Sequence, residues 1–193
     1  MKPLELKEIK PLSEYESIRK EFRKEIIALK KLRRIPLGDR ISLVFENRDT
    51  ILFQIQEMMR VEHIYHTAKV QDELDTYNPL IAGPGELSAT LFIEITESEQ
   101  IQEILDVLQG IDNGRSVFME IGQERVYGQF EEGHSKEDKL SAVHYVRFRL
   151  SPEQQATFRN GEIPAALVVD HPQYRARTPL DQEVRRELLR DLC

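Results

Sequence analysis

Residues 57–73 contain carboxylate and imidazole side chains of the types that bind metal ions. They are Glu57, Glu62, His63, His66 and Glu73. Such side chains together suit iron, manganese or zinc. The di-iron bundle signature requires a histidine three residues after a glutamate on each of two helices. Neither Glu57 nor Glu62 has one, and Glu73 is followed at that spacing by Thr76. The alternative is that these charges pair locally on helix surfaces, as Glu57 with Arg60.

The pattern of apolar residues before this stretch gives Glu62 a special position. A helix should begin near Asn47, and its apolar stripe is formed by Ile51, Ile55, Met58 and Met59. At about 100° per residue, Glu62 falls on that stripe and His66 lies one turn further along the same face. A buried carboxylate is costly unless it is paired. We therefore expect Glu62 to be partly buried against His66 or an arginine from elsewhere.

His144 is a second candidate for a catalytic or metal-binding residue. Residues 143–150 alternate as a strand, with His144 on the same side as Val146 and Phe148. This places the imidazole among apolar side chains, where a depressed pKa would suit a base or a metal ligand. The alternative is a core histidine that is hydrogen-bonded to a backbone carbonyl or a carboxylate.

Asp170 and His171 stand where the apolar strand at residues 165–170 enters a loop. Site residues are common at such positions. The alternative is that the aspartate bonds the following backbone and shapes the turn before Pro172.

Composition and missing motifs limit the possible functions. The 193 residues are 40% hydrophobic and 32% charged, as expected for one folded, soluble domain spanning 1–193. The first residues have no apolar signal region, and the single cysteine, Cys193, excludes an internal disulfide, so we expect a cytoplasmic protein. Phosphate-binding loops, dinucleotide-binding glycine motifs and the His-Glu-x-x-His zinc motif are absent from the sequence.

The charge is distributed unevenly along the chain. Residues 1–40 carry 12 basic and 7 acidic side chains, although the net charge of the whole chain is −7. The basic residues concentrate in Arg19, Lys20, Arg23, Lys24, Lys30, Lys31, Arg33 and Arg34. This run could bind phosphates or nucleic acid. It could equally form the solvated side of a helix that packs against an acidic body.

Hydrophobic periodicity predicts an α+β fold. A basic helix spans about residues 13–34, and four or five more helices follow. Six strands are expected, at residues 41–46, 87–96, 117–121, 124–130, 143–150 and 165–170. Two of them form a hairpin across Gly122. A charged loop should span 131–139, and Thr178 with Pro179 should begin the last helix. Hairpins mixed with single helices favour a mixed, mostly antiparallel sheet in one domain.

Four segments stand out together: FQIQEMMR at 53–60, ELDTYNPLI at 73–81, VHYVRF at 143–148 and DHPQY at 170–174. They resemble an uncharacterised bacterial family, domain of unknown function 3501. The resemblance spans nearly the whole chain and implies no established activity or catalytic residues. It does imply a context, because genes of this family often stand beside those of rubrerythrin-like di-iron proteins and iron–sulfur proteins of the heterodisulfide-reductase type. His63 and His66 lie outside these segments.

Three hypotheses follow. The first is a cytosolic accessory or interaction protein of an iron-dependent redox or peroxide-defence system, with rubrerythrin-like or iron–sulfur proteins as partners. The second is a metal-dependent or acid–base enzyme. Its candidate catalytic residues are Glu57, Glu62, His144, Asp170 and His171, and its candidate ligands for iron, manganese or zinc are Glu57, Glu62, Glu73 and His144. The third is nucleic-acid binding through residues 19–34, against which the acidic remainder of the chain argues.

Overall fold

The computed structural model describes residues 1–95, 97–131 and 140–192. Thr96, most of the charged loop expected at 131–139, and Cys193 lie outside this part. Within it, six α-helices and an eight-stranded sheet confirm the α+β class. The expected number of about six strands is wrong.

Every pair of neighbouring strands in the sheet is antiparallel. The strands are β1 (Arg34–Leu37), β2 (Ile41–Glu46), β3 (Glu86–Ile93), β4 (Val117–Ile121), β5 (Glu124–Phe130), β6 (Val143–Arg149), β7 (Ala165–His171) and β8 (Tyr174–Pro179). Their order is β1-β2-β3-β6-β5-β4-β7-β8. The two strands that the sequence did not reveal are the edges. β1 is only four residues long and contains Pro36, directly after the helix expected at about residues 13–34. β8 alternates arginines with small residues, and its last residues were assigned to a helix that actually begins at Gln182.

The sheet curls until β1 and β8 meet, which gives a nearly closed barrel. The hydroxyl of Tyr174 on β8 donates to the carbonyl of Leu37 at 2.6 Å and accepts from the N–H of Arg40 at 3.1 Å. The hydroxyl of Thr178 also donates to the carbonyl of Pro36. Proline has no N–H to offer to a ladder and is tolerated on edge strands. Side chains therefore join the two edges along this seam.

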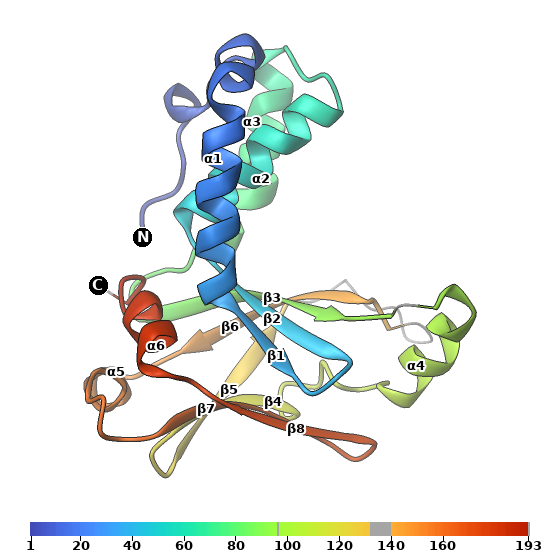
Figure 1. Ribbon diagram of the computed structural model, residues 1–193, viewed down its shortest axis with the longest axis vertical. Coiled ribbons are helices and arrows are strands. Elements are labelled where there is room, and N and C mark those ends of the chain that lie inside the picture. The colour runs from blue at the N-terminus through green and yellow to red at the C-terminus, as the bar shows by residue number, and fades with distance from the viewer. Residues whose placement is uncertain (96, 132–139, 193) are drawn as a thin grey trace.

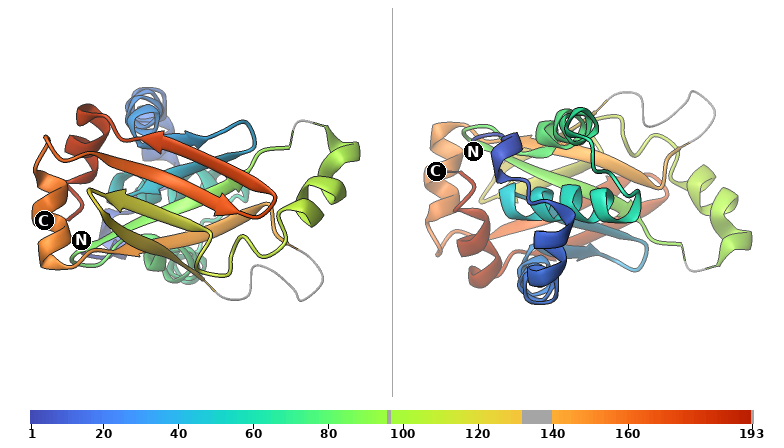
Figure 2. Two further views of the ribbon diagram at one scale, coloured as in Figure 1. Left: turned by 90° about the horizontal axis from the view of Figure 1, so that it is seen from below. Right: turned by 90° about the horizontal axis from the view of Figure 1, so that it is seen from above.

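The barrel interior is filled by alternate residues of each strand. Leu43 and Phe45 on β2, Leu91 on β3 and Phe148 on β6 are fully buried there. Helices α5 (Pro152–Arg159) and α6 (Gln182–Leu188) lie at one end of the barrel, and α4 (Ile101–Val107) lies at the other, next to the short 3₁₀ helix η3 (Ser98–Gln100) (Figure 2). No helix of the described residues covers the outer face of β4, β5, β7 and β8 (Figure 2).

Three helices form an arm that stands on the opposite side of the barrel (Figure 1). They are α1 (Leu12–Arg33), α2 (Arg48–Val61) and α3 (Thr67–Tyr77), with the short 3₁₀ helices η1 (Leu6–Glu8) and η2 (Asn78–Leu80) beside them. The expected start of α2 is confirmed, because the Asn47 side chain accepts from the N–H groups of Asp49 and Thr50. The arm has its own apolar core, which includes Ile55 and Leu74. Among the described residues, none of the helices combines the length and apolar character that a membrane span requires.

A buried ion network connects the arm to the barrel. Arg33, at the end of α1, is fully buried and donates to the Phe45 carbonyl at 2.8 Å and to the Glu187 carboxylate at 3.0 Å. It also donates to the carboxylate of Asp191. Burial raises the pKa of Asp191, although Arg33 opposes this shift. Since the network ties α1 to β2 and to the C-terminal helix, it fixes how the arm stands on the barrel.

Candidate functional site

Glu57 lies inside the arm and is held by two side chains of α1. Arg19 donates to both of its carboxylate oxygens, at 2.7 and 2.8 Å, and the hydroxyl of Tyr15 donates at 2.7 Å. The bond from Arg19 is the main reason why the pKa of Glu57 is lowered. The alternative of a local pair with Arg60 is not what the structure shows, since Arg60 donates to Glu16 at 2.6 Å. These contacts make Glu57 a link between α1 and α2.

Glu62 is exposed, which contradicts the expectation of a buried carboxylate. The helix ends at Val61, so the helical phase does not continue to Glu62 and His66. His63 adopts the left-handed conformation with φ of 52°, and the N–H of Ile64 then donates to the Met59 carbonyl at 2.9 Å. This is the Schellman arrangement, in which glycine is the usual residue at the left-handed position. The sequence has no glycine there, so the helix end was missed.

The metal candidates are not gathered at one place. Burial raises the pKa of Glu73, and the nearby charges of Glu62 and Asp72 add to this effect. Glu57 is engaged by α1, and His144 lies in the barrel rather than in the arm. Across residues 1–95, 97–131 and 140–192, no three His, Cys, Asp or Glu side chains are placed to hold one metal ion.

His144 points into the barrel, as its strand pattern predicted. It is buried opposite Leu91, and the ring of Phe130 meets it edge-on with 5.7 Å between the ring centres. Its Nε2 lies 2.7 Å from the carbonyl oxygen of Ser141, and Nδ1 lies 4.0 Å from the carboxylate of Asp112. Because a carbonyl can only accept, Nε2 donates in this bond. The geometry matches the core-histidine alternative.

Asp170 and His171 point to opposite sides of β7. Asp170 is exposed and accepts a hydrogen bond from Arg175 at 2.9 Å. His171 is buried, its Nε2 lies 3.1 Å from the Gln109 carbonyl, and its Nδ1 accepts from the N–H of Gln173 at 3.3 Å. The histidine therefore holds the segment after α4 against β7. The two neighbours do not form a shared site.

Several of the basic side chains between Arg19 and Arg34 form ion pairs within the protein. Arg19 binds Glu57, Arg33 is buried in its ion network, and Arg34 donates to Glu94 at 2.7 Å. Exposed basic side chains remain at Lys20, Arg23, Lys24 and Lys31. The basic surface that the sequence suggested is thus interrupted, since Lys24 lies 3.9 Å from the Glu21 carboxylate and Lys30 is partly buried.

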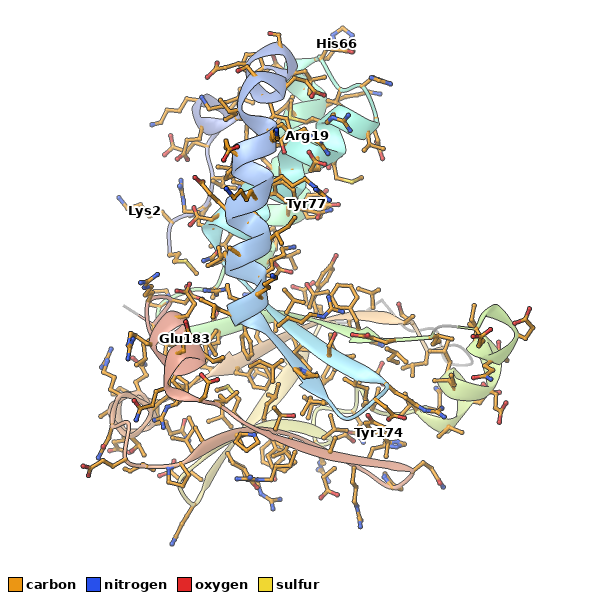
Figure 3. The ribbon with its side chains drawn as sticks, in the orientation of Figure 1. Lys2, Arg19, His66, Tyr77, Tyr174 and Glu183 are labelled. Atoms are coloured by element: carbon orange, nitrogen blue, oxygen red, sulfur yellow. The ribbon has the colours of Figure 1, made fainter. Side chains whose placement is uncertain are left out.

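An apolar hollow at the free end of the arm was not visible in the sequence. Its volume is about 240 Å³, and it lies between the N-terminal segment and the corner that joins α2 to α3. Its lining comprises Leu6, Ile9, Lys10, Pro11, Leu12, Met59, Ile64, Tyr65, Thr67 and Val70. The Schellman turn creates this corner, since it folds Ile64 back onto Met59. Figure 3 shows His66 at this end of the arm.

A second hollow of about 530 Å³ shares Leu12 and Tyr65 with the first. We call the two hollows together the arm-tip surface. Tyr65 is 71% exposed and Val61 is 65% exposed, which is unusual for large apolar side chains next to a hollow. The ring of His63 stacks on Tyr65 with an interplanar angle of 12°. The pair Glu16–Arg60 supplies charge at the margin. An apolar centre with a charged margin is typical of protein–protein interfaces.

Comparisons with known proteins place the whole chain in one family. Residues 3–192 match the family described as Protein of unknown function (DUF3501). The chain belongs to this family. The resemblance inferred from the four segments is thereby confirmed. No curated protein matches the sequence.

A solved structure extends the match to three dimensions. The chain is similar to a novel protein of unknown function from Burkholderia pseudomallei K96243, with 32% sequence identity and a TM-score of 0.91. The similarity covers 100% of both chains. The two proteins therefore share the DUF3501 fold over both the barrel and the arm.

Proposed function

We propose that this chain is an accessory protein that binds a redox protein through the arm-tip surface. The observation that carries the proposal is the exposure of Tyr65, which lines both hollows, and of Val61, which lines the second. Large exposed apolar side chains around a pocket mark binding sites, and tyrosine is one of the residue types that contribute most to binding energy. Each hollow can receive side chains from a short segment of a partner.

The class of partner comes from the family context. DUF3501 genes that stand beside those of rubrerythrin-like and iron–sulfur proteins suggest a cytoplasmic role in iron-dependent redox chemistry or peroxide defence. An accessory role also agrees with the contacts of the enzyme candidates. Glu57, His144 and His171 each bind another part of this chain, so their side chains serve the fold.

The test is a binding measurement with purified partners from the same genome. Calorimetry would compare the unmodified chain with a double variant, Val61→Ser and Tyr65→Ser, against a rubrerythrin-like protein and a heterodisulfide-reductase-type iron–sulfur protein. We expect the double variant to bind at least about tenfold more weakly.

The matched control is Ile101→Ser with Val107→Ser. These apolar side chains of α4 are 44% and 41% exposed at the far end of the barrel, so their removal should leave binding unchanged. The proposal is wrong if neither partner binds, or if both double variants weaken binding equally.

A further inference from the structure

A different cavity lies at the base of the arm, where three helices meet the outer face of the sheet. Its volume is about 210 Å³, and we call it the joint pocket. The sheet contributes Glu46, Thr90, Phe92, Val143 and Tyr145, and the arm contributes Lys30, Ile51, Gln54, Tyr77 and Leu80. Figure 3 shows Tyr77 at the base of α3, on the side of the arm toward the barrel. Three of the four segments that carry the family resemblance supply residues to this pocket.

Strand alternation explains why polar side chains reach this cavity. On β2, Leu43 and Phe45 point into the barrel, so Glu46 points outward toward the arm. On the neighbouring strands, Thr90 lies directly opposite Tyr145 and shares its outward face. A carboxylate, two phenols and an amide are thus brought together from segments that are far apart in the sequence.

Glu46 is the unusual member of the pocket. Its residue is only 7% exposed, and its carboxylate accepts a hydrogen bond of 2.9 Å from the hydroxyl of Thr90. In the part of the chain that the structure describes, no Lys, Arg or His nitrogen lies within 4.0 Å of this carboxylate. The nearby guanidinium of Arg33 donates to the backbone carbonyl of Glu46 at 3.3 Å. It forms its ion pairs with the carboxylates of Glu187 and Asp191.

A carboxylate can accept about four hydrogen bonds, and burial without a counter-charge is costly. The single hydroxyl donor of Thr90 leaves acceptor capacity that borders the joint pocket. A positively charged ligand would supply the counter-charge that Glu46 lacks.

The aromatic walls fit the same type of ligand. Tyr77 and Tyr145 line the cavity, and the faces of aromatic rings attract cations, as in the cages that recognise quaternary ammonium groups. Phe92 already lies 5.6 Å from the guanidinium of Arg34, measured from its ring centre. Burial raises the pKa of Tyr145, and the nearby Glu46 carboxylate adds to this shift.

We propose that the joint pocket binds a small organic cation, an amine or a quaternary ammonium compound. Its positive charge lies against Glu46, and its alkyl groups lie against Tyr77, Tyr145 and Leu80. The volume is below the roughly 300–1,000 Å³ of pockets for drug-sized ligands, which limits the ligand to a few carbon atoms around the charge. Lys30 borders the pocket from α1, where its own charge opposes the entry of a cation.

The first experiment compares a cation with its uncharged analogue. The full chain, in phosphate buffer free of amines, is titrated calorimetrically with choline, with butylamine and with 3,3-dimethylbutan-1-ol, in which carbon replaces the nitrogen of choline. We expect saturable binding of at least one of the two cations, and binding of the uncharged alcohol that is at least about tenfold weaker than that of the cation. Saturation by neither cation, or binding of the alcohol as tight as that of the cation that binds best, would overturn the proposal.

The second experiment assigns the binding to named residues. Glu46→Gln keeps the bond from Thr90 and removes the charge, so the affinity for the cation should fall at least about tenfold. Lys30→Met removes a like charge and should tighten binding about threefold. Glu103→Gln, on the distant α4, should change nothing.

The opposite pattern identifies a different ligand. If Lys30→Met weakens binding and Glu46→Gln does not, the pocket binds anions and the proposal is wrong. Should Glu46→Gln unfold at a lower temperature than the other variants, Tyr77→Leu, at a half-buried position, provides an independent test and should also weaken binding of the cation about tenfold.

Discussion

Arg33 and Glu187 are separated by 154 residues in the sequence, yet the guanidinium of the first donates to the carboxylate of the second at 3.0 Å. Both side chains are buried, and Asp191 completes the group. The last turn of α1 is therefore bound to the C-terminal helix at the point where the arm joins the barrel.

Replacing Arg33 with methionine should destabilise the protein by about 3–5 kcal/mol, because Glu187 and Asp191 would remain buried without a partner. Denaturant unfolding measures this loss. Arg34→Met is the matched control, since its exposed pair with Glu94 should contribute less than about 1 kcal/mol. A loss for Arg33→Met as small as that of the control would show that the buried network does not hold the arm.

The pair of Glu57 and Arg19 should make the stability depend on acid. Arg19 holds the pKa of Glu57 below its usual value of 4.5, so the unfolded chain takes up the proton first as the pH falls. The stabilisation is complete above about pH 4.5 and is lost as the pH falls through the lowered pKa.

Glu57→Gln should therefore lower the free energy of unfolding by about 1–2 kcal/mol at pH 7 and make its decline below pH 4.5 less steep. Unfolding curves between pH 3 and pH 7 test this expectation. Glu62→Gln is the control, since this exposed carboxylate lies near the end of the same helix. Parallel acid profiles for the unmodified chain and Glu57→Gln would contradict the assignment.

The positive φ of His63 leads us to expect a substitution that stabilises the fold, unlike the two substitutions above. Glycine adopts this conformation without the steric cost that a side chain carries. His63→Gly should therefore stabilise the fold by about 0.5–1 kcal/mol, even though the stacking on Tyr65 is lost. Glu62→Gly, at a residue with φ of −92°, should destabilise by a similar amount. Thermal unfolding of both variants decides, and a loss of stability for His63→Gly would show that the stacking outweighs the strain.

The periodicity of apolar residues along the chain predicted most of the helices and strands. It failed where contacts between residues far apart in the sequence decide the structure. The six strands expected from alternation are present, as are the hairpin at Gly122 and the start of α2 at Asn47. Strand β8 was missed because Arg175 and Arg177 point to solvent and leave no apolar run. Strand β1 was missed because part of its backbone bonds to the side chains of Tyr174 and Thr178, which come more than 130 residues later in the sequence.

The candidate sites show the same division. Glu62 was misplaced because the end of its helix depends on a histidine in the left-handed conformation, which periodicity does not reveal. The inward orientation of His144 was confirmed, because a strand of period two determines it. Glu46 was not singled out by the sequence, because only the packing of the arm shows that Tyr77 and Tyr145 line the same cavity.

The seam between β1 and β8 affects how readily two molecules of this protein can associate through their sheet edges. An open sheet edge is a template on which a strand of a second molecule can add, and repeated addition leads to fibres. Here each edge faces the other, Pro36 has no N–H to offer, and the carbonyls of Pro36 and Leu37 already accept from Thr178 and Tyr174. We therefore expect the hydroxyl groups of these two side chains to hinder the addition of a strand from a second molecule at this edge.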